Sequence, residues 1–502
     1  MAKTPPSNAL PRRILIANRG EIALRVARTA RRLGLEVLGV FSSADAGLPH
    51  LRLCHKAREL KGDPRQVYLN RAAILDAAKA LGADCIHPGY GFLSENEDFA
   101  ADVEAAGLAF VGPTAAQIEA LGDKVAARKA AQTAGLPTVP GTIAPVTDPT
   151  EAAKVAAQIG YPVLVKAAAG GGGRGMRVVE RPEQLTEALE RAGSEAQAGF
   201  GDGRVFLEKY FTAVRHVEIQ VFGDGRGQAV SLGERDCSVQ RRHQKLIEES
   251  PTPGLPPEVA RKMGELAAKL VAGVKYRGAG TVEFLVPFGS TDFYFIEMNT
   301  RLQVEHPVTE LRCGLDLVEE QLRVAGGLNF SFDPAKLELH GHAIEARVIA
   351  EDPSANFRPS LGKLEVVHWP AGPGIRVDAW AEAGLEVSPY YDSLLGKVLA
   401  WGRTRGEAIE RLTLALRETH ISPVRTTAAF IADVINETPF KSGAYATKLL
   451  GERKAPPVEA LSSDAAVLAA AEQLSRKASA SVPNFGYQGR ALSSWQKADG
   501  EK

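Results

Sequence analysis

The amino-acid sequence predicts a mixed α/β protein of several domains, and three observations support this. The chain has 502 residues, 45% of them apolar, and domains usually hold about 100–200 residues, so about three cores are expected. Short apolar runs alternate with helical patterns, which is typical of parallel sheets covered by helices. The 49 glycines and 30 prolines indicate many turns between strands.

Composition excludes several classes of protein. The 60 basic and 60 acidic residues cancel, so no overall field attracts nucleic acid or anionic lipid. There is no run of about 18 apolar residues, and residues 1–13 lack the apolar stretch of a signal peptide. We therefore expect a cytoplasmic protein with no nucleic-acid or membrane partner. The four cysteines form no C-x-x-C pair, which favours a reduced compartment over a zinc site or disulfide framework.

The first part of the chain has the pattern of a doubly wound domain. The apolar run Ile14–Ala17, the helical pattern Glu21–Leu33 and the apolar run Val37–Phe41 predict a βαβ unit. The alternation ends with a strand at Ala109–Val111, so we expect a domain over residues 1–123. Its first strand–helix turn has no G-x-G-x-x-G fingerprint, which argues against dinucleotide binding.

The next part predicts a hairpin. Helical patterns at Lys124–Ala134 and Ala152–Ile159 precede an apolar strand at Tyr161–Ala167. A glycine run follows, and the chain returns as a strand at Met176–Val179, so we expect a hairpin with a flexible tip. With its own strands and helices, the segment of about 137–211 is expected to be a mobile lid.

Aromatic and β-branched strands then flank an amphipathic helix. The strands lie within Val205–Val230 and Thr281–Asn299, and the helix is Pro257–Val271, which predicts a mixed sheet. A third unit ending near Leu450 is expected from two strand patterns and one helical pattern, namely Ala343–Ile349, Gly362–His368 and Arg405–Glu418. The Ala- and Ser-rich tail contains one helical pattern, at Ser463–Arg476.

The first chemical signal is the glycine run. An apolar strand delivers Lys166, and Gly170–Gly173 are followed by Arg174. Bare backbone N–H groups of such a run can close over phosphate oxygens, with the two cations adding positive charge. The pattern is not a P-loop, because G-x-x-x-x-G-K-[ST] is absent. The alternative is a loose surface hairpin.

The second signal is a pair of carboxylates. A hairpin turn centred near Ser290 places Glu283 opposite Glu297, and Asn299 lies on the same face two residues further on. Opposed carboxylates repel each other unless a cation lies between them. The set favours Mg²⁺ or Mn²⁺ bridging nucleotide phosphates, and the alternative is a solvent-facing polar edge with salt bridges.

Polar residues continue at every second position after this pair. If the strand runs on to the His306-Pro307 break, Arg301, Gln303 and Glu305 share the face of Glu297. A guanidinium and an amide fit a small planar oxyanion such as bicarbonate, with Glu305 as the base. An ordinary half-buried strand also shows this alternation.

The third signal is a cation-rich run at residues 234–245. Gln240, His243 and Lys245 are donors suited to a transferred phosphoryl group. A charge run by itself is usually a solvated face. Cys237 with His243 could form a thiol nucleophile, but no third group that would orient the histidine is identifiable, so we expect the cysteine to take no part.

Taken together, these motifs resemble the biotin carboxylase subunit or domain of biotin-dependent acyl-CoA carboxylases, in the ATP-grasp superfamily. The resemblance covers roughly residues 12–450. Its motifs are ANRGE at 17–21, HPGYGFLSEN at 87–96, GGGGRGM at 170–176, ERDCSVQRRHQK at 234–245 and EMNTRLQVEHPVTE at 297–310. It implies an ATP-grasp fold with a Rossmann-like N-terminal domain (1–123), an ATP-grasp domain (124–332), a C-terminal α+β domain (343–450) and a linker or tail (451–502).

The resemblance implies that ATP phosphorylates bicarbonate to carboxyphosphate, and that N1′ of biotin attacks the CO₂ released from it. It also assigns roles to residues. For ATP these are Lys124, Lys166, Gly170, Gly171, Gly172, Gly173, Gly175, Met176, Glu208, His216, Gln240 and His243. For two Mg²⁺ or Mn²⁺ ions they are Glu283, Glu297 and Asn299. For bicarbonate they are Arg301, Gln303, Val304 and the base Glu305, with Lys245 steadying the phosphoryl group. For biotin they are Arg347 and Tyr90.

The resemblance also implies partners. The chain has no Met-Lys-Met biotinylation motif, so biotin is expected on a separate carrier protein or domain, with a carboxyltransferase completing a multi-subunit carboxylase. Two alternatives remain: an ATP-grasp ligase that joins a carboxylate to an amine, and a non-catalytic nucleotide-binding subunit. An amine ligase has no need of the Arg301, Gln303 and Glu305 set, and a non-catalytic subunit has no need of the acidic residues.

Overall fold

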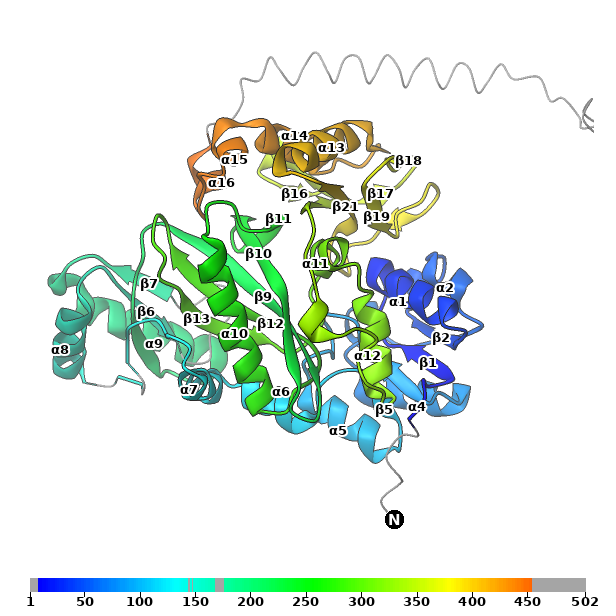
Figure 1. Ribbon diagram of the computed structural model, residues 1–502, viewed down its shortest axis with the longest axis horizontal. Coiled ribbons are helices and arrows are strands. Elements are labelled where there is room, and N and C mark those ends of the chain that lie inside the picture. Colours follow the sequence, from blue (N-terminus) through cyan, green and yellow to red (C-terminus); the bar gives the residue numbers. More distant parts are fainter. Residues whose placement is uncertain (1–7, 143–144, 147, 168–175, 454–502) are drawn as a thin grey trace, which may run out of the picture. The chain divides into compact units, whose positions relative to one another are not determined.

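The structure is a computed structural model that describes residues 8–142, 145–146, 148–167 and 176–453 (Figure 1). The described residues up to Gly451 form one compact unit. The glycine loop at 168–175 and the helical pattern expected at Ser463–Arg476 lie outside the described residues. No helix among the described residues is long and apolar enough to cross a membrane.

The N-terminal part is a parallel five-stranded sheet in the order β3-β2-β1-β4-β5 with helices against it, which confirms the doubly wound prediction. The first strand pairs with the second through Ile14 and Val37. The strands are β1 (Arg13–Ile16), β2 (Glu36–Phe41), β3 (Lys56–Glu59), β4 (Cys85–His87) and β5 (Ala109–Phe110). The helices are α1 (Gly20–Arg32), α2 (His50–Leu53), α3 (Pro64–Val67), α4 (Arg71–Leu81), α5 (Glu97–Ala105) and α6 (Ala115–Gly122).

A small three-stranded sheet, in the order β7-β6-β8, occupies the segment expected to be a lid. Lys166 of one strand pairs with Met176 of the next, so the hairpin expected around the glycine run is confirmed. The sheet packs against two helices in a hydrophobic cluster of its own. The elements here are α7 (Lys124–Ala134), α8 (Pro149–Ile159), β6 (Val163–Ala167), β7 (Met176–Val179), α9 (Leu185–Phe200) and β8 (Val205–Lys209).

An eight-stranded antiparallel sheet, in the order β13-β12-β9-β10-β11-β14-β21-β19, extends into the C-terminal part of the chain. The long helix α10 packs on its strands β9 and β10. The strands are β9 (Val214–Asp224), β10 (Ala229–Arg241), β11 (Gln244–Ser250), β12 (Arg277–Pro287), β13 (Tyr294–Asn299), β14 (His342–Ile349), β19 (Ile375–Ala379) and β21 (Leu394–Gly402). The helices are α10 (Pro257–Gly273), α11 (His306–Cys313) and α12 (Leu317–Ala325).

The C-terminal part adds helices and short strands around a second large core. The strand expected at Gly362–His368 is two short strands, since residues 362–363 pair with β20 and residues 366–368 pair with β22. The remaining elements are β15 (Glu351–Asp352), β16 (Arg358–Pro359), β17 (Gly362–Lys363), β18 (Val366–His368), β20 (Glu386–Val387), α13 (Arg405–Glu418), β22 (His420–Ser422), α14 (Ala428–Asn436), α15 (Thr438–Ser442) and α16 (Leu449–Glu452).

One buried carboxylate joins the C-terminal helices to the sheet. Glu249 of β11 accepts hydrogen bonds from His342 at 2.6 Å, from Arg405 at 2.8 and 2.9 Å and from the Tyr445 hydroxyl at 2.5 Å. Burial opposes ionisation, but the hydrogen bonds from His342 and Arg405 lower the pKa of Glu249 to about 2. Three segments of the chain therefore depend on one ionised group.

We predict that Glu249→Gln lowers the free energy of unfolding by about 3 kcal/mol at neutral pH, because it removes the buried charge that holds the partly exposed Arg405. Because the folded pKa of Glu249 lies below its unfolded value, this stabilisation is lost as the pH falls through the folded pKa. Urea unfolding between about pH 5 and about pH 2 should show the difference from wild type shrinking. A constant difference would contradict the assignment of the charge to Glu249.

Candidate active site

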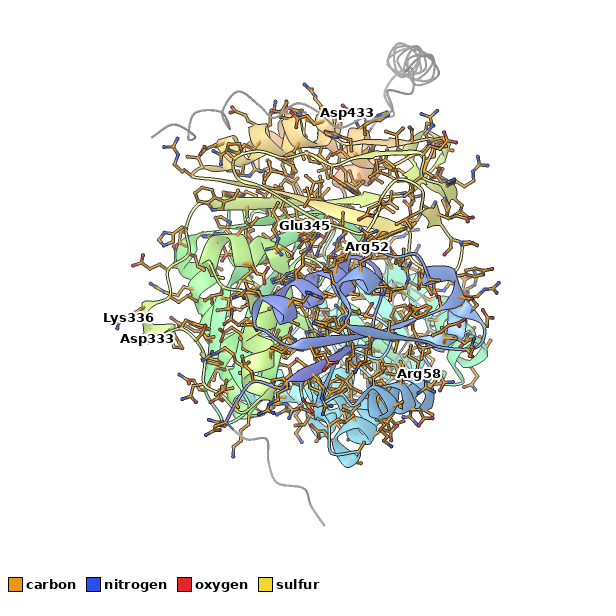
Figure 2. The ribbon with its side chains drawn as sticks, turned by 90° about the vertical axis from the view of Figure 1, so that its right-hand side faces the viewer. Arg52, Arg58, Asp333, Lys336, Glu345 and Asp433 are labelled. Atoms are coloured by element: carbon orange, nitrogen blue, oxygen red, sulfur yellow. The ribbon has the colours of Figure 1, made fainter. Side chains whose placement is uncertain are left out.

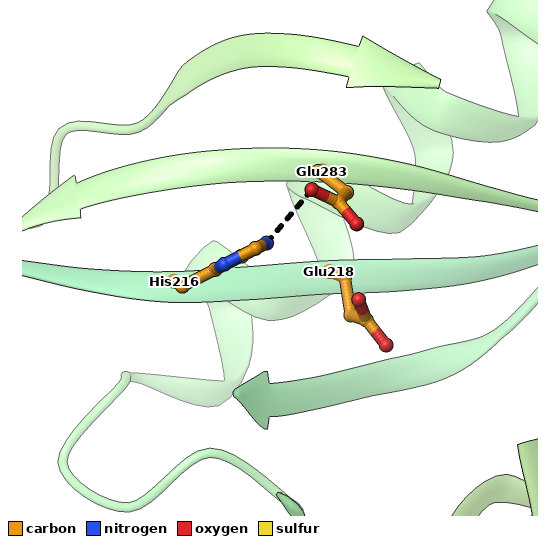
Figure 3. A group of neighbouring side chains, drawn as sticks. All are labelled: His216, Glu218 and Glu283. Atoms are coloured by element: carbon orange, nitrogen blue, oxygen red, sulfur yellow. Dashed lines mark ion pairs between the residues drawn. The ribbon is translucent and has the colours of Figure 1, made fainter. Parts of the chain in front are cut away.

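A row of charged residues crosses the large sheet. Glu283 of β12 lies between Glu297 of β13 and Glu218 of β9, and Glu218 in turn faces Arg235 of β10. The pairing of Glu283 with Glu297 is the one expected from the sequence. His216 lies on the same strand as Glu218, and its Nε2 forms an ion pair with Glu283 Oε2 at 3.0 Å (Figure 3). Burial and Glu283 together raise the pKa of Glu297.

Lys245 is the cation shared by the carboxylates of this site. Its Nζ lies 2.7 Å from Glu218, 3.3 Å from Glu283 and 2.7 Å from Glu305. Burial alone would lower the pKa of Lys245, but these three carboxylates raise it well above its ordinary value. The fully buried Arg235 adds a second cation, 2.6 Å from Glu218.

The strand β13 ends at Asn299, so the prediction that it continues to His306 was wrong. Residues 300–305 form a loop instead, and Glu305 directly precedes helix α11, whose first turn contains Pro307. Proline suits the first turn of a helix, so the His-Pro pair begins a helix here and does not end a strand. The polar residues at every second position therefore do not share the face of a strand.

The loop nevertheless brings the expected oxyanion residues together. Arg301 donates to Gln303 at 2.8 Å, and Gln303 Nε2 lies 3.4 Å from Glu283 Oε1. Asn299 Nδ2 donates to the same oxygen of Glu283 at 2.8 Å. Arg301 is also held by Glu95 at 2.8 Å. An amide and a guanidinium thus adjoin the carboxylate row, which suits a small anion next to a metal-bound phosphate.

Glu305 and Arg347 form the other end of the site. Glu305 is fully buried, with Lys245 on one oxygen and Arg347 on the other, the latter at 2.8 Å. Burial would raise the pKa of Glu305, but Lys245 and Arg347 hold it well below its ordinary range. Arg347 also contacts Glu248 at 2.6 Å. Glu305 is therefore an ionised carboxylate, available as a proton acceptor.

Tyr90 and Val304 are held by groups that connect the N- and C-terminal parts. The hydroxyl of Tyr90 donates to Glu21 of α1, and Lys397 Nζ lies 3.1 Å from the same residue. Lys397 also donates to the carbonyl of Val304 at 2.7 Å. Burial raises the pKa of Tyr90 well above its ordinary value, with the charge of Arg347 acting in the opposite direction.

The expected ATP residues are only partly gathered. Lys166 of β6 pairs with Glu208 of β8 at 2.5 Å, and Gln240 Nε2 lies 3.2 Å from His216 Nδ1. Lys124 begins helix α7, and its charge opposes the rise in the pKa of Glu297 that burial and Glu283 cause. His243 is exposed in the turn between β10 and β11, and Met176 is exposed at the start of β7. Gly170, Gly171, Gly172, Gly173 and Gly175 lie outside the described residues.

Sequence reasoning missed four residues of the site. Glu95 holds Arg301, and Glu248 holds Arg347. The other two, Glu218 and Arg235, continue the row of charged residues across the sheet. A polar residue at every second position of an otherwise apolar strand, as at 216, 218 and 220, was the signal available for Glu218. Burial raises the pKa of the Cys237 thiol well above the ordinary value, which supports the expectation that this cysteine takes no part.

The fold and the site define the class of protein first. A carboxylate row on an antiparallel sheet, next to a small sheet that carries a glycine-rich hairpin, is the arrangement of an ATP-grasp enzyme. The family model "Carbamoyl-phosphate synthase L chain, ATP binding domain" matches residues 123–332. Models for the N-terminal and C-terminal domains of biotin carboxylase match residues 11–118 and 345–452. The chain belongs to the biotin carboxylase family.

Individual relatives agree with this assignment. The chain is 48% identical over 445 residues to the biotin carboxylase of Haemophilus influenzae, covering 88% of this chain and 99% of that protein. It is 46% identical over 440 residues to biotin carboxylase 1 of Bacillus subtilis, covering 88% of this chain and 98% of that protein. The chain is also similar to a solved structure, the biotin carboxylase domain of Hydrogenobacter thermophilus 2-oxoglutarate carboxylase in complex with MgADP, ADP and bicarbonate. The two superpose with a TM-score of 0.84 at 42% identity, covering 89% of this chain and 100% of that one.

We predict that Lys245→Met lowers the free energy of unfolding by about 3–5 kcal/mol, because the buried carboxylates around it lose a shared cation. Urea unfolding at neutral pH checks this. The matched control is Lys262→Met, which removes an exposed lysine from helix α10 and should stay within about 0.5 kcal/mol of wild type. Equal stability of the two variants would show that Lys245 does not neutralise the row.

Proposed function

We propose that this chain carboxylates N1′ of biotin carried by a separate protein, using ATP and bicarbonate, as the first half-reaction of a biotin-dependent carboxylase. The observation that carries the proposal is Glu305, a buried carboxylate held ionised between Lys245 and Arg347 at the end of the carboxylate row. A nucleotide-binding protein without catalysis has no need of an ionised buried base, whose desolvation is costly.

The carboxylate row is the proposed binding site for the metal ions and the nucleotide. In this proposal Glu283, Glu297 and Asn299 hold Mg²⁺ or Mn²⁺, since carboxylate and amide oxygens fit hard cations and the two carboxylates face each other across the strand pair. The bound ions would neutralise charge on the phosphates of ATP. Lys124, Lys166, Glu208, His216, Gln240 and His243 bind ATP, with Met176 and the glycine loop over the phosphates. The compact core of the hairpin segment supports its role as a lid.

Bicarbonate occupies the loop at residues 300–305. Arg301, Gln303 and the backbone of Val304 bind it, and Glu305 accepts its proton. The resulting oxyanion attacks the γ-phosphorus of ATP, with Lys245 steadying the phosphoryl group, and ADP leaves as carboxyphosphate forms. Carboxyphosphate breaks down to CO₂ and phosphate. The phosphate takes the proton of biotin N1′, the nitrogen attacks CO₂, and Arg347 stabilises the negative charge that develops on the ureido oxygen.

The partners follow from this chemistry. A biotin carboxyl carrier protein or domain presents biotin beside Arg347 and Tyr90, and a carboxyltransferase passes the carboxyl group to an acyl acceptor in the cytoplasm. Relatives named as parts of pyruvate and propionyl-CoA carboxylases support a multi-subunit enzyme. The division into residues 1–123, 124–332, 343–450 and a tail at 451–502 belongs to the same proposal.

We predict that Glu305→Gln reduces bicarbonate-dependent ADP release by at least about 100-fold, because the site loses its base. The measurement is steady-state ADP release with Mg²⁺, with and without bicarbonate and free biotin. The control, Glu320→Gln, removes a buried carboxylate on helix α12 that bonds to Ser331 and should behave as wild type. Wild-type ADP release that ignores both bicarbonate and biotin would favour the carboxylate–amine ligase alternative.

Removing a candidate metal ligand has a separate readout. We predict that Glu283→Gln weakens Mn²⁺ binding by about 10-fold or more, because one of the two opposed carboxylates becomes neutral. Electron paramagnetic resonance of free Mn²⁺, titrated with protein and ADP, measures the binding without turnover. Unchanged binding, with Glu320→Gln again as control, would remove Glu283 from the metal site.

A further inference from the structure

Two fully buried glutamates face each other behind the biotin end of the site. Glu248 of β11 pairs directly with Glu345 of β14, and both side chains are 0% exposed. Figure 2 shows Glu345 in the interior, between the N-terminal helices and the C-terminal strands, far from the peripheral pair Asp333 and Lys336. The proposed mechanism uses neither glutamate.

The two glutamates differ in their contacts. Glu248 Oε1 accepts from Arg347 Nε at 2.6 Å, and Arg347 reaches Glu305 at 2.8 Å with its terminal nitrogen. Among the described residues, neither oxygen of Glu345 and only one oxygen of Glu248 has a hydrogen-bond partner. Arg347 therefore forms a hydrogen bond with Glu248. It forms none with Glu345, which lies two residues away on the same strand, β14.

The charges around Glu345 come from four elements. Lys397 of β21 lies nearby, but its Nζ is already held by Glu21 and the Val304 carbonyl. Glu248 faces Glu345 from β11, Arg347 shares its strand, and Glu305 lies beyond Arg347. Glu345 therefore has two negative neighbours, Glu248 and Glu305, and two positive ones. Both cations, Lys397 and Arg347, already contact other groups.

An ionised Glu345 would thus carry a buried charge with no partner, which is costly. Burial and the charge of Glu248 raise the pKa of Glu345 well above its ordinary value, although the charges of Lys397 and Arg347 oppose this rise. Burial also raises the pKa of Glu248, to about 7, against the charge of Arg347. Since Arg347 holds Glu248 and no hydrogen-bond partner among the described residues holds Glu345, a proton shared by this pair belongs on Glu345.

We propose that Glu345 acts as a neutral acid and is a positioning residue for Arg347, filling the space beside Glu248 without adding a second negative charge. The Nε atom of Arg347 then stays on the carboxylate of Glu248, and its terminal nitrogen stays directed at Glu305 and the substrate. The role in catalysis rests on the proposed function, in which Arg347 faces biotin. Ionising Glu345 would pull the guanidinium back from the substrate, so kcat/KM for biotin falls as the pH rises through the pKa of Glu345.

The direct test is the infrared spectrum of the full chain. A protonated carboxylic acid has a carbonyl stretching band that a carboxylate lacks. In difference spectra at neutral pH, Glu345→Gln should lose such a band relative to wild type, and Glu345→Met, which is equally neutral, should lose the same band. Loss of carboxylate intensity instead, with the acid band unchanged, would overturn the proposal.

Kinetics give the second readout. Glu345→Gln mimics the neutral acid, so kcat/KM for free biotin should stay within about threefold of wild type at neutral pH and should not show the wild-type decline at alkaline pH. Glu320→Gln should retain that decline. A loss of more than about tenfold at neutral pH in Glu345→Gln would mean that the charged form is needed.

The two proposals fail separately. If wild type shows no biotin-stimulated ADP release, the proposed function fails, and the infrared bands still decide the protonation of Glu345. If turnover occurs and the acid band is absent, only the inference about Glu345 fails.

Discussion

The site depends on the balance between buried carboxylates and the few cations available to them. Glu218, Glu283 and Glu305 converge on Lys245, and each also has a partner of its own in Arg235, His216 or Arg347. Removing Lys245 would leave three buried carboxylates with fewer opposing charges. The position of Lys245 is therefore fixed by the same contacts that keep Glu305 ionised. In the proposed function, structural and catalytic requirements meet in Lys245, and bound metal ions would add to the same balance.

Antiparallel register is what places these charges. Because side chains alternate between the faces of a strand, a pairing that aligns residue 283 with both 297 and 218 puts three carboxylates side by side. A slip of one residue would turn Glu283 to the opposite face. Hydrophobic residues that alternate with the charged ones, such as Val282 and Phe284, pack into the core under α10 and hold the register.

The site also joins the ends of the chain. Lys397 of the C-terminal part reaches Glu21 in the first helix and the Val304 carbonyl in the loop at residues 300–305. Arg376 and Arg25, from opposite ends of the sequence, both contact Glu310 of helix α11, at 2.7 and 2.6 Å. Helix α11 follows Glu305 directly, so the proposed base is anchored from both sides. Such a site cannot be completed by the central part of the chain alone.

The sequence by itself determined the doubly wound start, the hairpin around the glycine run and the pairing of Glu283 with Glu297, because local periodicity and turn position fix these features. Its motifs were also sufficient for the family. It misplaced residues 300–305 on a strand, because alternation of polar residues has the same appearance in a loop whose shape is set by distant partners such as Glu95. Only the tertiary structure decided that Lys245 is shared by three carboxylates, that Glu248 holds Arg347 and that Glu345 is buried beside them. These contacts join strands that are far apart in sequence, and no local pattern records which charge will neutralise which.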